Sequence, residues 1–143
     1  MIIGIVGSIA SGKDTVADYL KEKGFRTISL SDILREIMRA EGIETTIPNM
    51  TEFGNNLRNN KGYAFLAERA TGQIKESEDV LITSIRQVGE IKFLKKRSDF
   101  TLVKLDAPIE MRLERLIKRK REGDIRNMEE LKEIEARQAD GKD

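Results

Sequence analysis

A chain of 143 residues fits a single domain with a modest hydrophobic core. Charged residues make up 36% of it and hydrophobic residues 38%, and the net charge is only +1, so no overall field attracts the chain to nucleic acids or membranes. Cysteine and histidine are both absent, which excludes disulfides, thiolate catalysis, zinc–cysteine sites and imidazole acid–base chemistry.

The N-terminal stretch MIIGIVGS has no basic residue before its apolar run, and the run is too short for a signal peptide. Nothing in the sequence approaches the ~20 consecutive apolar residues of a membrane-spanning helix. We therefore expect a cytoplasmic protein with no membrane partner.

The first half of the chain alternates short strands with helices. Residues 2–6 (IIGIV) are almost wholly apolar, which is typical of a strand buried on both faces of a parallel sheet. Ser31 is the expected N-cap of the second helix, and the stretch around Pro48 is expected to be a connector. The other elements predicted in this half are a strand over 25–30 and helices over 15–23, 32–41, 51–59 and 63–76.

The second half continues the alternation. Pro108 suits the first position of a long helix, and Asn127 suits the N-cap of the last one. The apolar stripe predicted for the long helix comprises Ile109, Leu113, Leu116 and Ile117. The elements predicted are strands over 80–85 and 100–105 and helices over 88–97, 108–122 and 127–138. Together they predict one domain over 1–143, a three-layer α/β/α fold around a parallel sheet of about four strands.

Residues 7–15 read GSIASGKDT, close to the phosphate-binding pattern G-x-x-x-x-G-K-[ST], and they follow a buried strand and precede a helix. The two glycines allow close backbone approach, and the loop amides and the helix N-terminus then point at an anion. The alternative is a plain glycine-rich turn. The loop residues expected to form the ATP site are Gly7, Ser8, Ala10, Ser11, Gly12, Lys13, Asp14 and Thr15.

Asp14 stands where the pattern has Ser or Thr, whose hydroxyl holds Mg²⁺. Because a carboxylate is repelled by a polyphosphate, Asp14 is expected to act on Mg²⁺ through water, or only to favour the helix dipole from the first turn. Thr15 is the hydroxyl expected beside the phosphate and the metal. ATP and Mg²⁺ are thus the expected cofactors, with Thr15 and Asp14 as the metal-site residues.

Four stretches together resemble the P-loop kinases of the nucleoside-monophosphate-kinase-like group, which includes dephospho-CoA-kinase-like, deoxynucleoside monophosphate kinase and adenylate-kinase-related proteins. They are GSIASGKDT, LSDILRE (30–36), ITSIRQVGE (82–90) and LDAPIEMRLERLIKRKREGD (105–124). The resemblance implies a P-loop NTPase fold, an acceptor-binding helical segment over 31–78 and a lid-like segment over 117–138.

The resemblance also implies roles for side chains that face the loop, since guanidinium forks suit phosphate oxygens. The expected acceptor-binding residues are Asp32, Arg35, Arg58, Arg86 and Glu90, with Asn55 and Asn56 beside them. Arg115 and Arg119 are expected to contact ATP, and Arg121 and Arg137 to belong to the lid. The expected catalytic residues are Lys13, Asp32, Arg86 and Arg119. The alternative for each arginine is a solvated helix face or, for Arg86, a salt bridge with Glu90.

Two departures from the kinase pattern matter. Related kinases often carry an Asp near the end of the third strand, where this chain has Thr83 and Ser84. They also generally add a fifth strand after the lid, which this sequence does not show, so we expect a naturally short member, a fragment, or a subunit completed by a partner. An uncovered sheet edge then favours a homodimer.

The sequence therefore predicts an ATP-dependent kinase that transfers a phosphoryl group to a phosphorylated nucleotide-type acceptor: a nucleoside or deoxynucleoside monophosphate, or dephospho-CoA. The alternative is an ATP-binding regulatory protein with weak or no kinase activity, which the missing Asp favours. RNA binding through Arg112–Arg121 ranks last, because only 5% of residues are aromatic and the net charge is near zero.

Overall fold

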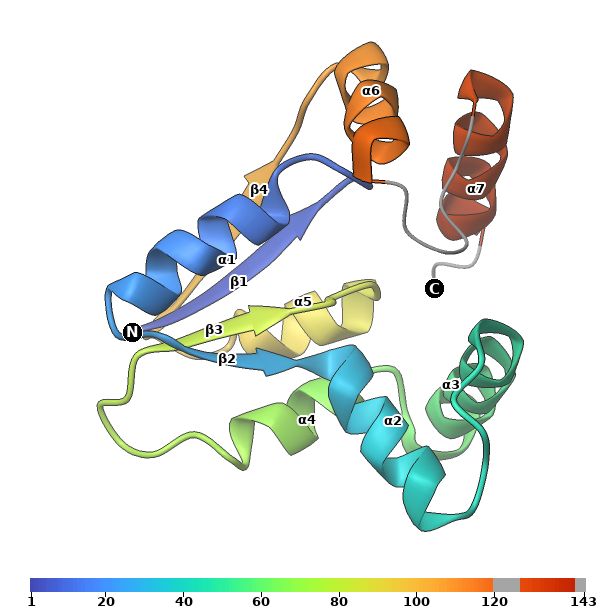
Figure 1. The fold of residues 1–143 in the computed structure, drawn as a ribbon. Coiled ribbons are helices and arrows are strands. Elements are labelled where there is room, and N and C mark those ends of the chain that lie inside the picture. Colours follow the sequence, from blue (N-terminus) through green and yellow to red (C-terminus); the bar gives the residue numbers. More distant parts are fainter. Residues whose placement is uncertain (120–126, 141–143) are drawn as a thin grey trace.

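The computed structural model describes the backbone of residues 1–119 and 127–140, and the side chains of residues 1–118 and 127–136 (Figure 1). Strands and helices alternate along most of the chain. In order, the elements are β1 (Ile2–Gly7), α1 (Lys13–Glu22), β2 (Arg26–Ser29), α2 (Leu30–Ala40), α3 (Ile47–Lys61), α4 (Phe65–Thr71), β3 (Val80–Thr83), α5 (Val88–Leu94), β4 (Phe100–Leu105), α6 (Ile109–Arg119) and α7 (Met128–Asp140).

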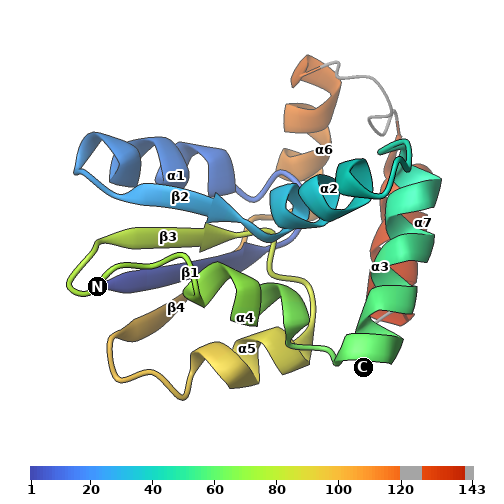
Figure 2. The same ribbon diagram turned by 90° about the horizontal axis from the view of Figure 1, so that it is seen from below.

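The four strands form one parallel sheet in the order β2-β3-β1-β4, which confirms the predicted α/β fold. β1 pairs Ile2 with Val80 of β3, and Gly7 with Leu105 of β4. Because the strands are parallel, their carboxyl ends meet at one edge, and α2, α3, α6 and α7 lie beyond it (Figure 2). β4 is an edge strand of this sheet; the homodimer stays a prediction.

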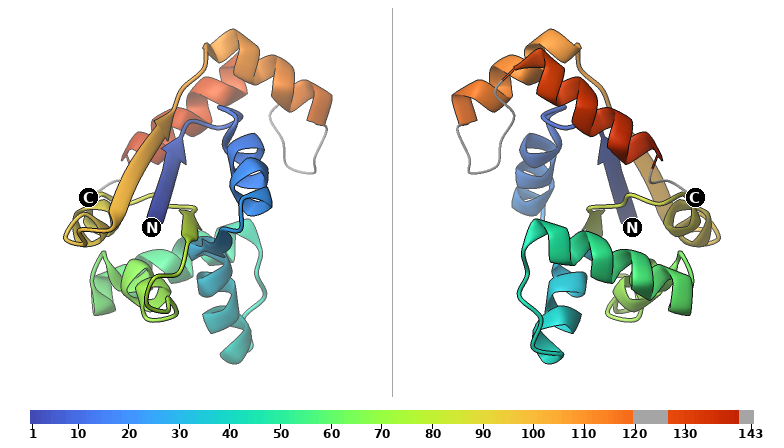
Figure 3. Two further views of the ribbon diagram at one scale, coloured as in Figure 1. Left: turned by 90° about the vertical axis from the view of Figure 1, so that its left-hand side faces the viewer. Right: turned by 90° about the vertical axis from the view of Figure 1, so that its right-hand side faces the viewer.

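Helices cover both faces of the sheet, α1 on one and α4 with α5 on the other (Figure 3). The main core lies between the sheet and α2, α4 and α5, with Ile2, Val80 and Ile82 fully buried. A second, smaller cluster joins α6 and α7 through Leu116 and Leu131. Ile9 and Ala10 of the predicted phosphate loop pack against this second cluster, so the C-terminal helices contact the loop directly.

Several helix bounds differ from the prediction. Ser29, not Ser31, caps α2, because its Oγ accepts a hydrogen bond from the Asp32 amide (3.4 Å). α3 begins at Ile47, with Thr46 as its cap and Pro48 inside the first turn, where its missing N–H costs no helical hydrogen bond. The helix predicted over 63–76 is limited to Phe65–Thr71.

The last two helices follow the prediction in part. The Glu130 amide donates to Asn127 Oδ1 (2.9 Å), so Asn127 caps α7 as expected. Ile117, however, is 47% exposed and does not belong to the buried stripe of α6. Residues 120–126, which include Arg121, and the side chains of Arg119 and Arg137 lie outside the described part. Among the described helices, none is long and apolar enough to cross a membrane.

An ion pair joins the start of β2 to the turn before β3. Arg26 donates from Nε and Nη2 to the two carboxylate oxygens of Glu78 (2.6 and 3.0 Å), and its Nη2 also donates to the Gln73 carbonyl (2.7 Å). The Arg26 hydrogen bonds, followed by the one from the Lys75 amide, lower the pKa of Glu78 from 4.5 to about 2. The pair therefore ties two neighbouring strands at the edge opposite the phosphate loop.

Replacing Glu78 with Gln is expected to lower Tm at neutral pH but not in strong acid. The folded-state pKa of Glu78 lies below its unfolded value, so its stabilisation is complete above 4.5 and is lost as the pH falls toward about 2. Thermal unfolding at a series of pH values checks this: the Tm difference between the two proteins should close over that window. Glu76→Gln, an exposed change in the same turn, is the control. A difference that persists below the window contradicts the assignment.

Candidate functional site

The loop between β1 and α1 has the geometry of an anion-binding turn. Gly12 caps α1 with a φ of 103° and without a side-chain hydrogen bond, and Lys13 is the first helical residue. The first amides of a helix have no intrahelical acceptor and carry the positive end of its dipole. The backbone at this point therefore presents donors to an anion at the carboxyl edge of the sheet.

Gly7 is required at the end of β1 because two atoms occupy the space of a side chain. A Cβ at this position would lie 2.6 Å from the Leu105 carbonyl oxygen and 2.6 Å from Ser11 Oγ. The carbonyl belongs to the neighbouring strand β4 and is held by the pairing of Gly7 with Leu105. The loop can therefore fold back against the sheet only if residue 7 has no side chain.

Gly7→Ala is expected to destabilise the protein by ~1–3 kcal/mol, the usual effect of overpacking. This corresponds to a fall in Tm of roughly 3–12 °C for a chain of this size. Differential scanning calorimetry measures the change. Gly72→Ala is the matched control, since Gly72 has a helical φ of −64° and a Cβ there meets its neighbours at an ordinary 3.5 Å. An unchanged Tm for Gly7→Ala would contradict the steric requirement.

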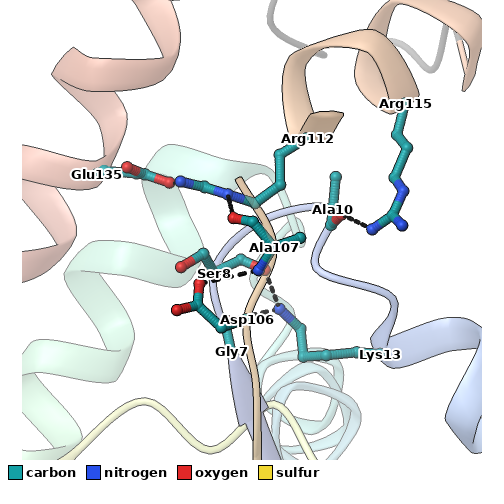
Figure 4. A network of polar contacts seen from close by, with 9 residues as sticks. All are labelled: Gly7, Ser8, Ala10, Lys13, Asp106, Ala107, Arg112, Arg115 and Glu135. Atoms are coloured by element: carbon teal, nitrogen blue, oxygen red, sulfur yellow. Dashed lines mark hydrogen bonds and ion pairs between the residues drawn. The ribbon is translucent and has the colours of Figure 1, made fainter. Parts of the chain in front are cut away.

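The side chain of Lys13 folds back over the loop. Its Nζ donates to the carbonyls of Gly7 (2.7 Å) and Ser8 (2.8 Å), as Figure 4 shows. These contacts hold the ammonium beside the loop amides rather than in solvent. A point charge in this place suits the outer phosphates of a nucleotide.

An arginine from α6 reaches the same loop from more than 100 residues away in the sequence. Arg115 Nη1 donates to the Ala10 carbonyl (2.8 Å) and also lies 3.9 Å from the position of a Cβ on Gly12. Ala10 itself has a φ of 60°, which is uncommon for a residue with a side chain. Lys13 and Arg115 thus place two cations on one loop (Figure 4).

Arg112 lies on the same helix as Arg115, but it is buried and does not reach the loop through a hydrogen bond. It is 6% exposed, its Nε donates to the Ala107 carbonyl (3.0 Å), and its Nη1 pairs with Glu135 of α7. The guanidinium therefore ties α6 and α7 to the segment after β4 (Figure 4). It is not part of an exposed basic surface, which removes one residue from the RNA-binding alternative.

Three predicted acceptor arginines gather near the ends of β2 and β3. Arg35 donates to Asp32 (2.8 Å) at the surface, and Arg58 lies 3.8 Å from the buried carboxylate of Glu90. Arg86 keeps an exposed surface, yet burial among protein atoms lowers its pKa; Glu90 acts to raise that pKa, and Arg58 and Arg35 to lower it. The charges of Glu90, Arg58 and Arg35 therefore all act on the guanidinium of Arg86.

Asn56 lines a hollow of about 230 Å³ together with Ile43 and Phe53. Residues two positions apart on a helix point in different directions, so Asn56 and Arg58 face opposite ways. Asn55 is exposed.

Two polar features at the sheet edge were missed from the sequence. The hydroxyls of Ser29, Ser31 and Ser84 form a triangle of 2.9–3.1 Å contacts, and Ser84 adopts a φ of 61°. Asp106 follows β4, where the register that pairs Gly7 with Leu105 places it next to Ser8 (Figure 4). The side chains at the end of β3 are thus neutral, and the acidic side chain beside the loop, Asp106, follows β4 instead. Only the order of the strands in the sheet could have revealed that Asp106 lies beside the loop.

A Mg²⁺ ion at this loop would need ligands from the phosphates of a nucleotide as well as from the protein. The described residues contain no group of three Asp or Glu side chains that could hold a metal by themselves. Thr15 and Asp14 are both exposed in the first turn of α1, next to the loop. Mg²⁺ usually binds through one or two protein oxygens together with phosphates and water, and Thr15 and Asp14 fit that mode.

The chain is similar to known proteins both in sequence and in fold. The family model of the AAA domain matches residues 6–132. A UPF0200/UPF0201 protein of Archaeoglobus fulgidus is 35% identical in an alignment 143 positions long, which covers 96% of this chain and 44% of that protein. A UPF0200 protein of Methanothrix thermoacetophila is 33% identical over 124 residues, 86% of this chain and 68% of its own length. The chain thus spans less than half of the first relative and about two thirds of the second.

Among solved structures, the shikimate kinase of Aquifex aeolicus has a TM-score of 0.56 and covers 98% of this chain and 79% of its own. Its sequence is 23% identical, so the similarity shows the fold alone. That fold is an α/β P-loop fold with a parallel sheet flanked by helices.

Proposed function

The chain belongs to the UPF0200 proteins and carries an AAA domain of the P-loop class over most of its length, and from this premise we propose that it is an ATP-dependent kinase. The acceptor in this proposal is a small molecule that already bears a phosphate, such as a nucleoside or deoxynucleoside monophosphate or dephospho-CoA. The convergence of Lys13 and Arg115 on one loop carries the proposal.

Phosphoryl transfer depends mainly on positioning and on neutralising the negative charge spread over the transferred group. Lys13 and the amides at the start of α1 are suited to the outer phosphates of ATP. Arg115 is suited to approach the same phosphates from the side of α6. Bound Mg²⁺, held near Thr15 and Asp14, would supply charge neutralisation between the phosphates. Asp106 and Asp32 are two further carboxylates near the carboxyl edge, and Asp32 is the candidate to orient the acceptor.

The arginines near the ends of β2 and β3 support an anionic acceptor. Arg35 and Arg86 have exposed surface, and a guanidinium fork binds a phosphate through two hydrogen bonds. A protein that only binds ATP has no use for a second group of this kind. The shikimate kinase similarity leaves open an acceptor that carries a carboxylate instead, because carboxylates and phosphates are bound by the same forks.

The regulatory alternative is favoured by one observation, the neutral end of β3, where Thr83 and Ser84 replace an acid. In that alternative the loop binds ATP with little turnover. The acceptor arginines then serve only to pack the helices.

A direct assay decides between the two. The protein is incubated with Mg-ATP and a panel of nucleoside and deoxynucleoside monophosphates, dephospho-CoA and shikimate, and ADP formation is followed. The proposal expects acceptor-dependent ADP with at least one phosphorylated acceptor. ATP binding without turnover on any of them would overturn the kinase; turnover on shikimate alone would keep the kinase and overturn the phosphorylated acceptor.

A further inference from the structure

The last two helices contact the phosphate loop through a small apolar cluster of their own. Leu116 of α6 and Leu131 of α7 are almost fully buried, and Ile9 and Ala10 of the loop pack against them. The other members of the cluster come from the same two helices and are Ile109, Leu113 and Ile134. Among the described residues, no strand and none of the helices α1–α5 contributes to this cluster. Its apolar contacts therefore join α7 to α6 and to the loop.

A buried arginine fixes how α7 lies against α6. Apolar contacts are not directional, so a cluster with two buried leucines does not by itself define the orientation of a helix. Arg112 of α6 adds directed contacts: its Nε donates to the Ala107 carbonyl (3.0 Å), and its Nη1 pairs with Oε1 of Glu135 on α7 (Figure 4). The Ala107 amide is held as well, since it donates to Asp106 Oδ1 (2.9 Å). The guanidinium therefore joins α7 to the segment that follows β4.

Stability alone does not account for this ion pair. Arg112 is 6% exposed, and the side chain of Glu135 is 28% exposed. Removing charges from water is costly, and a buried pair is often no more stabilising than two apolar side chains of similar size. A charged pair adds a defined geometry, because its hydrogen bonds require particular distances and angles. We therefore looked for what the placement of α7 does.

The conformation of Ala10 depends on these two helices. Its φ of 60° is uncommon for a residue with a side chain, and such a conformation persists only where the surroundings hold it. Ala10 packs against the cluster of α6 and α7, and its carbonyl accepts a hydrogen bond from Arg115 Nη1 (2.8 Å). Gly12, two positions later, caps the helix whose first amides point at an anion. A change at Ala10 is therefore passed along the backbone to those amides.

We propose that Arg112 and Glu135 are positioning residues of the nucleotide site. Their ion pair holds α7 against the phosphate loop, and α7 in this place keeps Ala10 in the conformation that presents the loop amides to ATP. The proposal rests on the proposed function only for ATP as the ligand. Neither residue of the pair contacts ATP, because Arg112 is buried with two of its donors on Ala107 and Glu135, and a carboxylate repels phosphates.

The double variant Arg112→Met with Glu135→Met tests this role. Two apolar side chains replace the pair without leaving a lone buried charge, so circular dichroism should show a folded protein. Isothermal titration calorimetry then measures the affinity for Mg-ATP well below the Tm of the variant. We expect roughly one molecule in ten to keep the loop in its binding conformation, which weakens the affinity about tenfold. An affinity equal to that of the wild type overturns the proposal.

Arg97→Met with Asp99→Met is the matched control. It also removes an arginine–carboxylate pair (2.9 Å), but one that lies just before β4, at the amino edge of the sheet. Its affinity for ATP should stay within about twofold of the wild type, as for other surface substitutions. A control that loses as much affinity as the test variant would show a general effect of removing an ion pair and would overturn the role of α7.

Adding Ala10→Gly to the double variant separates positioning from a purely structural role. Glycine adopts a positive φ as readily as a negative one, so the loop then depends less on α7. About threefold or more of the lost affinity should return, because the left-handed conformation no longer has to be imposed on a side chain. General damage to the fold is not repaired by this change. A triple variant that binds ATP no better than the double variant overturns the proposal.

Glu135→Ala replaces the double variant if that protein does not fold. The side chain of Glu135 is partly exposed, so its removal opens Arg112 to water. Helix α7 loses the same directed contact, and the affinity for Mg-ATP is again expected to fall about tenfold. An unchanged affinity overturns the proposal in this form of the test as well.

The outcome is separable from that of the kinase assay. Acceptor-dependent ADP formation, together with a double variant that binds ATP like the wild type, overturns the inference and leaves the kinase. ATP binding that depends on the Arg112–Glu135 pair, without turnover on any acceptor, overturns the kinase and leaves the inference. A wild-type protein that binds no ATP overturns both.

Discussion

Lys13→Ala is expected to weaken ATP binding by roughly 10- to 150-fold, the range for losing a hydrogen bond to a charged group. Turnover in the acceptor assay should fall further, by ~10²–10³-fold, because a positioned charge contributes most when negative charge spreads in the transition state. The structure holds the ammonium 2.7 and 2.8 Å from two loop carbonyls, beside the amides at the start of α1. Isothermal titration calorimetry with ATP and an ADP-release assay measure the two effects.

Lys21→Ala is the matched control for this change. Lys21 lies in the last turn of α1 and is exposed, so the control removes a lysine of the same helix at the end far from the loop. Its ATP affinity should change by less than about twofold, as for other surface substitutions. Lys13→Ala also removes two hydrogen bonds to the loop, which costs ~1–3 kcal/mol of stability, so binding is measured well below its Tm. If both variants bind ATP like the wild type, the loop is not the nucleotide site.

Arg86→Ala is expected to raise the Kd or KM of the acceptor by roughly 10- to 150-fold and to leave ATP binding unchanged. Arg86 lies at the carboxyl edge of the sheet, keeps an exposed surface and, among the described residues, makes no ion pair. Its donors are therefore suited to an incoming anion. Arg86→Lys keeps the charge but loses the planar fork, so it should recover part of the affinity.

Steady-state kinetics with the active acceptor, together with ATP titrations, measure this split. A kinase loses acceptor affinity through Arg86→Ala, whereas a regulatory ATP-binding protein is little affected. Arg97→Ala, on the far side of the molecule from the carboxyl edge, should change neither parameter. An effect of Arg86→Ala on ATP binding as large as that on the acceptor would place Arg86 at the phosphate loop instead.

The phosphate loop was predictable because its features are contained in one continuous stretch. A buried strand, two glycines, a lysine and a helix start follow one another in GSIASGKDT, and the backbone of Gly7 and Gly12 adopts the geometry that this order implies. The cap at Asn127 was predictable for the same reason, and the α/β class was predictable from the alternation of strands and helices along the chain. The first turn of α3 was not predictable, because a proline is typical both of a connector and of the first helical turn, where Pro48 lies.

Contacts between distant segments could not be predicted in this way. Arg112 and Arg115 both lie beside the apolar stripe of one helix. Arg112 is nevertheless buried against Glu135, whereas Arg115 reaches Ala10. Helical periodicity gives the face of a side chain, but the packing of α7 decides which arginine is covered. Asp106 likewise gained a place beside the loop only through the register of β4 with β1.

The sequence by itself determined that a cation and a row of backbone amides stand at the end of β1, because these depend on neighbouring residues alone. Tertiary structure decided which other charges join them. It brought Arg115 to the loop, buried Glu90 beside Arg58, and left Arg86 exposed at the carboxyl edge. The physical reason is that burial and charge pairing arise where elements pack together.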